Sequence, residues 1–162
     1  MSKTPTHQFM QSAIKLASQS IQQQGGPFGA VIVKDNKIIG RGSNQVTRHH
    51  DPTAHAEVEA IRDACHTLQS HSLQGCTLYA SSEPCPMCLS AIYWAHLDGV
   101  YYANAYAQAS KIGFDDAFIF QELSLPHSEK KLPIEQIHAP DLLNEAQNVF
   151  KQWENSPDKK AY

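Results

Sequence analysis

The segment Ser-Glu-Pro-Cys-Pro-Met-Cys at residues 82–88 restricts the folds open to this chain more than any other stretch. It supplies two thiols, while Thr-Ala-His-Ala-Glu at residues 53–57 supplies an imidazole and a carboxylate. Two thiolates and a histidine are good zinc ligands, and a tetrahedral zinc with three protein ligands keeps one position for water. The fold therefore has to bring two separate segments together, with His55, Cys85 and Cys88 as the expected ligands.

The residues around the two cysteines predict the start of a helix. Proline is favoured in the first turn of a helix, so Pro86 places Cys85 at the cap and Cys88 in the first turn. A helix N-terminus carries about half a positive charge, which lowers the pKa of a thiol and favours the thiolate that zinc requires. The alternatives for this segment are a redox-active cysteine pair and two buried cysteines without a metal.

Two glutamates compete for the role of proton acceptor beside the metal. Residues two apart on a regular helix point to roughly opposite sides, so spacing alone favours Glu59, which shares a helix face with His55. Glu57 converges with His55 only if both residues lie in an irregular first turn. Geometry by itself therefore selects Glu59.

Other side chains compete for the remaining ligand positions. His49 and His50, in a polar segment predicted to be a loop, are the alternative imidazoles. Cys65 and Cys76 are the candidates for a fourth protein ligand, which would close the site and make the zinc structural. Neither cysteine belongs to a second Cys-x-x-Cys, and Cys65 falls on an apolar helix face, where cysteine behaves as a small hydrophobic residue. An open fourth position is therefore favoured.

Helical and strand patterns alternate along the chain, which predicts an α/β fold with helices on both faces of a sheet. An N-terminal helix is expected to end at Gly25-Gly26-Pro27, before a β-hairpin made by residues 28–33 and 37–41. The further elements expected along the chain are a loop at 42–51, a helix that starts at Asp51-Pro52-Thr53 and ends near Leu68, a strand at 76–80, a helix from Pro86 to about 98, a strand at 100–103, helical pieces at 105–121 broken at Gly113, a strand at 132–138, and a helix capped by Asp141.

Composition narrows the class of protein. The length of 162 residues predicts one domain over 1–162, with a polar tail at 155–162. The net charge of −3 and the lack of a long basic run argue against a nucleic-acid partner. No apolar run approaches the roughly 20 residues of a membrane span, which argues against a membrane partner. Four cysteines without a signal-peptide pattern favour a reducing compartment, so we expect a cytoplasmic protein.

These segments resemble those of the cytidine-deaminase-like zinc deaminases, whose signature is His-x-Glu followed by Pro-Cys-x-x-Cys. The resemblance is greatest to the bacterial guanine deaminases, and it covers nearly the whole chain. Ala-Ile-Tyr-Trp-Ala at 91–95, Gly-Phe-Asp-Asp at 113–116 and the final Tyr162 indicate the guanine group. The other matching segments are residues 25–35, 51–58 and 83–90.

The resemblance implies a three-layer α/β/α sandwich with a central five-stranded mixed sheet. It implies one Zn²⁺ per chain, held by His55, Cys85 and Cys88, with Glu57 as the proton shuttle. The implied reaction is the hydrolytic deamination of guanine to xanthine and ammonia. The implied assembly is a homodimer whose subunits exchange their C-terminal segments.

The resemblance also implies four contacts to a purine base. Phe28 would stack on the purine, Asn44 would hydrogen-bond to it, Asp116 would accept from its donor edge, and Tyr162 would reach the pocket from the partner subunit. Each has a simpler alternative, because Phe28 suits a core, Asn44 suits a turn, Asp116 suits a solvated helix start and Tyr162 suits a frayed end.

Three other functions stay open at the level of sequence. A tRNA adenosine deaminase shares the zinc signature, although the negative charge and the missing basic tail weigh against it. A cytosine deaminase is the second alternative. A structural-zinc interaction module is the third, and in that case Glu57 would have no role.

Overall fold

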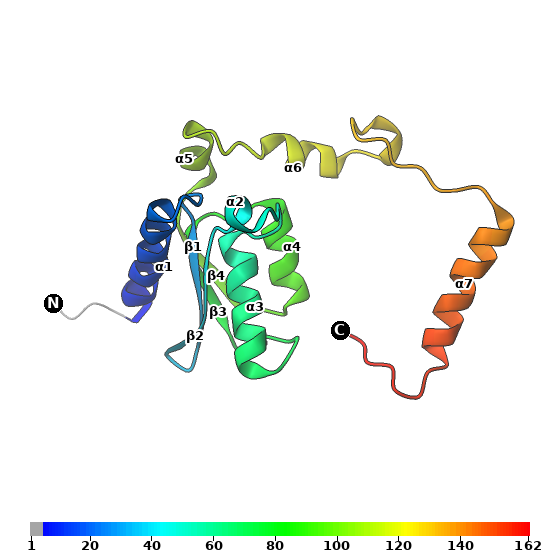
Figure 1. Cartoon of the computed structure of the whole chain (residues 1–162), viewed down its shortest axis with the longest axis horizontal. Helices are drawn as coiled ribbons and strands as arrows, with labels where there is room; N and C mark the ends of the chain where they lie inside the picture. The colour runs from blue at the N-terminus through cyan, green and yellow to red at the C-terminus, as the bar shows by residue number, and fades with distance from the viewer. Residues whose placement is uncertain (1–4) are drawn as a thin grey trace. The chain divides into compact units, whose positions relative to one another are not determined.

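The computed structural model describes residues 5–162 (Figure 1). The chain divides into two units. The first unit ends at Asp116 and holds the sheet together with both expected metal-ligand segments. The second unit is Ala117–Tyr162. The single domain expected over 1–162 stays a prediction. Among the described residues, no helix has both the length and the apolar character needed to cross a membrane.

Four strands form the sheet in the described part of the chain, in the order β2-β1-β3-β4. β1 pairs antiparallel with β2 and with β3, whereas β3 pairs parallel with β4. The expected hairpin and the mixed character of the sheet are therefore confirmed. The strands are β1 Gly29–Lys34, β2 Lys37–Ser43, β3 Thr77–Ser82 and β4 Gly99–Asn104.

Helices cover both faces of this sheet, as a three-layer sandwich requires (Figure 1). On one face, α1 (Pro5–Gln22) packs Phe9, Met10 and Leu16 around a buried group of strand residues, Val31, Val33 and Tyr79. On the other face, α3 (Ala56–Leu68) and α4 (Pro86–Trp94) share the main core with Ala30, Ile32, Leu78 and Ala80. Neighbouring residues of β1 thus point to opposite layers, which follows from the two-residue period of a strand.

The fifth strand expected at 132–138 is wrong, because these residues form no strand in the structure. Leu132, Ile134 and Ile137 are all exposed. Pro133 has no N–H to give to a strand ladder, and Ile137 breaks the alternation that Leu132 and Ile134 begin. The segment therefore has neither the donor pattern nor the periodicity of a strand within the sheet.

The predicted start of the ligand-bearing helix is also wrong. Asp51 Oδ1 accepts hydrogen bonds from Thr53 N at 2.8 Å and from Thr53 Oγ1 at 2.7 Å, so this segment forms a turn. The helix α3 begins only at Ala56, with His55 as its N-cap. Part of the predicted loop at 42–51 is also regular, since β2 runs to Ser43 and Val46–His49 form the short helix α2.

The segment after β4 is helical in pieces, as expected. Residues 105–121 divide into α5 (Tyr106–Lys111) and α6 (Ala117–Ser124), with Gly113 at φ 96° in the break between them. A short 3₁₀ helix, His127–Glu129, follows. The last helix, α7, is Pro140–Glu154 with Ala139 as N-cap, so Asp141 lies inside the first turn rather than at the cap.

Two glycines allow α3 to lie directly on β2. A Cβ on Gly42 would lie 2.0 Å from Ala56 O and 2.5 Å from Ala60 N. A Cβ on Gly40 would lie 2.6 Å from Ala60 O and 2.7 Å from Ala64 Cβ. The backbone of the strand and that of the helix are thus in contact, which sets the position of the N-terminus of α3.

We predict that Gly42→Ala destabilises the fold by about 3 kcal/mol or more, because the added methyl group meets backbone atoms that cannot rotate away. The metal content of the purified variant should also fall, since the start of α3 carries His55. Chemical denaturation and metal analysis measure these two effects.

Gly99→Ala is the matched control, because a Cβ at Gly99 meets nothing within 4 Å. Its free energy of unfolding should stay within about 0.5 kcal/mol of the parent. Equal stability of the two variants would contradict the close contact between α3 and β2.

Candidate metal centre

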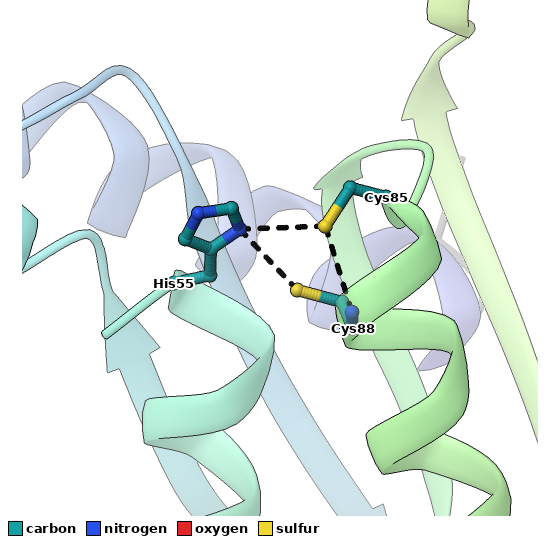
Figure 2. Close-up of side chains that lie close together, drawn as sticks. All are labelled: His55, Cys85 and Cys88. Atoms are coloured by element: carbon teal, nitrogen blue, oxygen red, sulfur yellow. Dashed lines mark hydrogen bonds between the residues drawn. The ribbon is translucent and has the colours of Figure 1, made fainter. Parts of the chain in front are cut away.

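The three expected ligands converge from the starts of two helices (Figure 2). His55 Nδ1 lies 3.5 Å from Cys85 Sγ and 3.5 Å from Cys88 Sγ. The three ligand atoms all lie within 4.8 Å of one another. In Figure 2 the imidazole projects from the start of α3 toward the two sulfurs at the start of α4.

The spacing of these donors fits zinc. Zinc bonds of about 2.3 Å to sulfur and about 2.05 Å to nitrogen, at a tetrahedral angle, separate the nitrogen and the sulfur by about 3.6 Å. The observed separations of 3.5 Å on both sides of His55 agree with that value. One imidazole and two thiolates are also a donor set that zinc prefers. The residues present therefore fit a zinc ion.

The starts of two helices position all three ligands. Cys85 is the N-cap of α4, as predicted, and its Sγ accepts a hydrogen bond from Cys88 N at 3.5 Å. His55 is the N-cap of α3, in an extended conformation with φ −71° and ψ 156°. The positive ends of both helix dipoles therefore point at the donor group, where they stabilise thiolates.

The structure brings Glu57 to the centre, and not Glu59. Glu57 is buried, with 6% of its surface exposed, and its Oε2 lies 3.4 Å from Cys88 Sγ. Glu59 instead forms an ion pair with Arg62 at 2.6 Å. The spacing rule failed because it assumed that His55 lies inside the helix. His55 precedes the helix, so the opposite-sides rule does not apply to the pair.

The pKa values of the two cysteine thiols are shifted in opposite directions. Hydrogen bonds from Cys88 and His55 lower the pKa of Cys85 to about 4, whereas the pKa of Cys88 is raised by its hydrogen bond to Cys85 and by burial. Without a metal, the centre thus holds a thiolate at Cys85 and a thiol at Cys88. Zinc binding has to release the proton of Cys88, so the affinity for zinc falls as the pH falls.

The pKa values of Glu57 and His55, which lie beside the two thiols, are also shifted. Burial raises the pKa of the Glu57 carboxyl above its ordinary value. The pKa of His55 is also raised, chiefly by its hydrogen bond with Cys85 and to a smaller extent by the carboxylates of Glu57 and Asp116. Asp116 therefore lies close enough to the centre to act on His55 electrostatically.

The rival ligands lie elsewhere. Among the described residues, the ligand group consists of His55, Cys85 and Cys88. His49 and His50 are exposed on and after α2. Cys65 and Cys76 stand outside the group, and burial raises the pKa of both thiols. The protein thus offers three ligands, which leaves a tetrahedral ion one open position.

Asn44 is held by the backbone around it. Its Oδ1 accepts hydrogen bonds from Gly26 N at 3.4 Å and Val46 N at 3.2 Å. The buried Ser20 adds a hydrogen bond from its Oγ to Asn44 O at 3.2 Å. Two backbone donors fix the side-chain oxygen as their acceptor, so the amide N–H group is what Asn44 offers to a ligand.

The three other predicted contact residues differ in what surrounds them. Phe28 packs against the main core and meets Phe114 edge-on, with ring centroids 4.8 Å apart at 87°. Asp116 ends the first unit. Tyr162 belongs to the second unit, with 76% of its surface exposed. The purine contacts of all three stay predictions.

Sequence reasoning missed Glu83 and Tyr106. Glu83 Oε2 accepts a hydrogen bond from Tyr106 N at 2.8 Å, and the Tyr106 hydroxyl donates to Asp115 Oδ1 at 3.0 Å. The position of Glu83 inside the cysteine segment was a signal that could have drawn attention to it. Tyr106 carried no such signal.

Comparison with known proteins places these features in a family. Residues 3–104 match the family described as the cytidine and deoxycytidylate deaminase zinc-binding region. Guanine deaminase of Bacillus subtilis (strain 168) is 48% identical over 155 residues, which cover 95% of this chain and 97% of that protein. The tRNA-specific adenosine deaminase of Aquifex aeolicus is 35% identical over 151 residues, 91% of this chain and 95% of that protein.

Solved structures show the same relationship. The crystal structure of guanine deaminase from Bacillus subtilis matches with a TM-score of 0.90 at 47% identity, over 96% of this chain and 97% of that one. The crystal structure of NE0047 in complex with 2,6-diaminopurine matches with a TM-score of 0.65 at 30% identity, over 71% of this chain and 64% of that one. The family match spans all three ligands, and the chain therefore belongs to the cytidine and deoxycytidylate deaminase zinc-binding family.

Proposed function

We propose that the protein is a zinc-dependent aminohydrolase that converts guanine to xanthine and ammonia. The observation that carries this proposal is a three-ligand centre with the buried carboxyl of Glu57 3.4 Å from one ligand. A structural zinc site would have a fourth protein ligand and no use for such a carboxyl. The 48% identity to guanine deaminase of Bacillus subtilis supports guanine as the substrate.

In this proposal Glu57 moves the protons of the reaction. A zinc ion held by His55, Cys85 and Cys88 would lower the pKa of water toward about 7 and so supply a nucleophile at neutral pH. The Glu57 carboxylate takes a proton from the attacking water and passes it to a ring nitrogen. It then takes the second proton, from the hydroxyl now bound to the ring carbon, and gives it to the amine, which leaves as ammonia while that carbon becomes a carbonyl. Burial raises the pKa of this carboxyl above its ordinary value, which is the direction that helps it hold a proton between the two transfers.

Other residues of the chain would orient the base. Phe28 supplies a ring face for stacking, and its edge-on contact with Phe114 keeps that ring in place. The Asn44 amide donates to an acceptor of the purine, since its oxygen is already bound to the backbone. Asp116 accepts from the donor edge of the base.

We also propose a cytoplasmic homodimer in which the C-terminal segment 155–162 closes the site of the partner. In residues 117–162 no side chain is buried, although many are large and apolar. A unit without a core of its own needs another surface, and a second copy of the chain supplies one by symmetry. The exposed apolar residues of this unit include Phe118, Phe120, Leu123, Val149, Phe150 and Trp153.

An ammonia-release assay tests the proposed substrate. Guanine should be deaminated, with xanthine as the product, whereas guanosine, cytosine, adenine and a tRNA anticodon stem-loop should not react. In the same assay, Glu57→Gln should lose on the order of a hundredfold or more in turnover while its zinc content stays unchanged, since the amide cannot carry the proton.

Glu59→Gln is the matched control for this carboxyl, because Glu59 pairs with Arg62 away from the centre. Its turnover should stay close to that of the parent. An active Glu57→Gln beside an inactive Glu59→Gln would reverse the assignment of the base. Activity on the stem-loop but not on guanine would replace the proposed substrate with tRNA adenosine.

Cys88→Ser should strip the zinc and abolish turnover, since a serine hydroxyl is a poor replacement for a thiolate ligand. Metal analysis should give one zinc per chain in the parent protein and close to none in the variant. Cys65→Ser, which lies outside the ligand group, should keep its zinc. Full occupancy in Cys88→Ser would show that the ligand assignment is wrong.

Deletion of residues 155–162 should leave zinc in place and sharply reduce guanine turnover, because closure of the site excludes bulk water. Exchange of the C-terminal segments between subunits also predicts the result of mixing two inactive variants. Mixing the deletion variant with Glu57→Gln should restore activity, since a heterodimer pairs an intact Glu57 with a tail from the partner. Full activity of the deletion variant alone, or no recovery on mixing refolded chains, would exclude an exchanged tail.

A further inference from the structure

The loop that carries Cys85 is tied to the neighbouring strand and helix by Glu83. Glu83 lies between the end of β3 at Ser82 and the cap of α4. Its backbone N–H donates to Asn104 O at 2.8 Å, at the end of β4. Its carboxylate accepts from Tyr106 N at 2.8 Å, at the start of α5. The backbone of Tyr106 is therefore anchored to Glu83, which precedes the metal ligand Cys85 by two residues.

The side chain of Tyr106 extends this connection to an acidic pair. Its hydroxyl donates to Asp115 Oδ1 at 3.0 Å. The pKa of Tyr106 is raised by desolvation and by hydrogen bonds to Asp116 and Asp115, so the phenol stays a donor at neutral pH. A hydrogen bond to a carboxylate is charge-assisted and stronger than a neutral one.

The segment that Tyr106 holds has little packing of its own. Residues 112–115 are exposed and lie between two short helices, with Gly113 in a left-handed conformation. Phe114 is held by its edge-on contact with Phe28, and Asp115 by the hydroxyl of Tyr106. These two contacts lie on either side of one peptide bond, so together they define the direction in which the chain enters Asp116.

We propose that Tyr106 is a positioning residue that aligns the Asp115–Asp116 pair with the metal centre, from a backbone anchored by Glu83. This inference rests on the proposed function, in which Asp116 accepts hydrogen bonds from the base. Tyr106 is not one of the metal ligands. It acts by reducing the conformations open to the acidic pair before the base arrives.

Tyr106→Phe removes the hydroxyl and keeps the ring. We expect kcat/KM for guanine to fall roughly 10- to 100-fold, the range for losing one hydrogen bond to a charged group. The rise in KM should exceed the fall in kcat, because the aligned carboxylate binds the base before the reaction begins. Zinc content should not change. Tyr101→Phe, on β4, is the matched control and should keep the kinetic constants of the parent.

A double-mutant cycle separates positioning from an independent role. In an Asp115→Asn background, Tyr106→Phe should lose part of its effect on kcat/KM, because Asp115→Asn removes one of the two carboxylates to which the hydroxyl donates. Parent-like kinetics in Tyr106→Phe would overturn the inference. So would a loss that adds in full to that of Asp115→Asn, or a loss confined to kcat.

Failure of the proposed function gives a different result. If the parent protein does not deaminate guanine while zinc is bound, the substrate assignment fails. The same cycle measured by chemical denaturation then still decides whether Tyr106 and Asp115 are coupled. Non-additive losses of unfolding free energy would keep the Tyr106–Asp115 contact, and additive ones would reject it.

Discussion

The whole centre depends on the close contact between α3 and β2. Gly42 and Gly40 let the helix backbone touch the strand, and small alanines line the helix side of this contact. The contact fixes the first residue of α3, and with it the cap residue His55. An imidazole on a looser helix would miss the sulfurs, which accept only a narrow range of distances around zinc. Backbone packing between β2 and α3 thus sets the geometry of the metal centre.

The centre also concentrates negative charge where water is scarce. A thiolate at Cys85, a second sulfur at Cys88 and the carboxyl of Glu57 lie within a few hydrogen-bond lengths of one another. Two helix N-termini offset part of the repulsion, and protonation of Cys88 removes more of it when no metal is bound. A divalent cation offsets the rest. Ion binding and folding are therefore linked, because an ion that binds only the folded chain adds its binding free energy to stability.

Much of this could be predicted from sequence, where local chemistry and final structure coincide. Pro86 marks the start of α4 and puts Cys85 at its cap, so the sulfur ligands followed directly. Which glutamate lies beside the centre could be decided only from the tertiary structure, since a turn closed by Asp51 delays α3 until Ala56 and takes His55 out of the helix. The apolar residues at 132–138 suggested a strand, but Pro133 lacks the backbone N–H that a strand within the sheet would need. The contacts of Tyr106 with Glu83 and Asp115 could not be predicted, because they appear only in the tertiary structure.

The order of the elements along the chain has a consequence for biosynthesis. All four strands of the described sheet, both ligand-bearing helix starts and Glu57 lie before residue 105. A chain made from its N-terminus can complete these parts while the last third is still being translated, since domains generally fold as units during synthesis. Metal acquisition can then precede the arrival of the C-terminal unit. A nascent chain stalled at that stage would already hold a charged centre, and the apolar residues of the second unit would emerge beside a folded body rather than a disordered one.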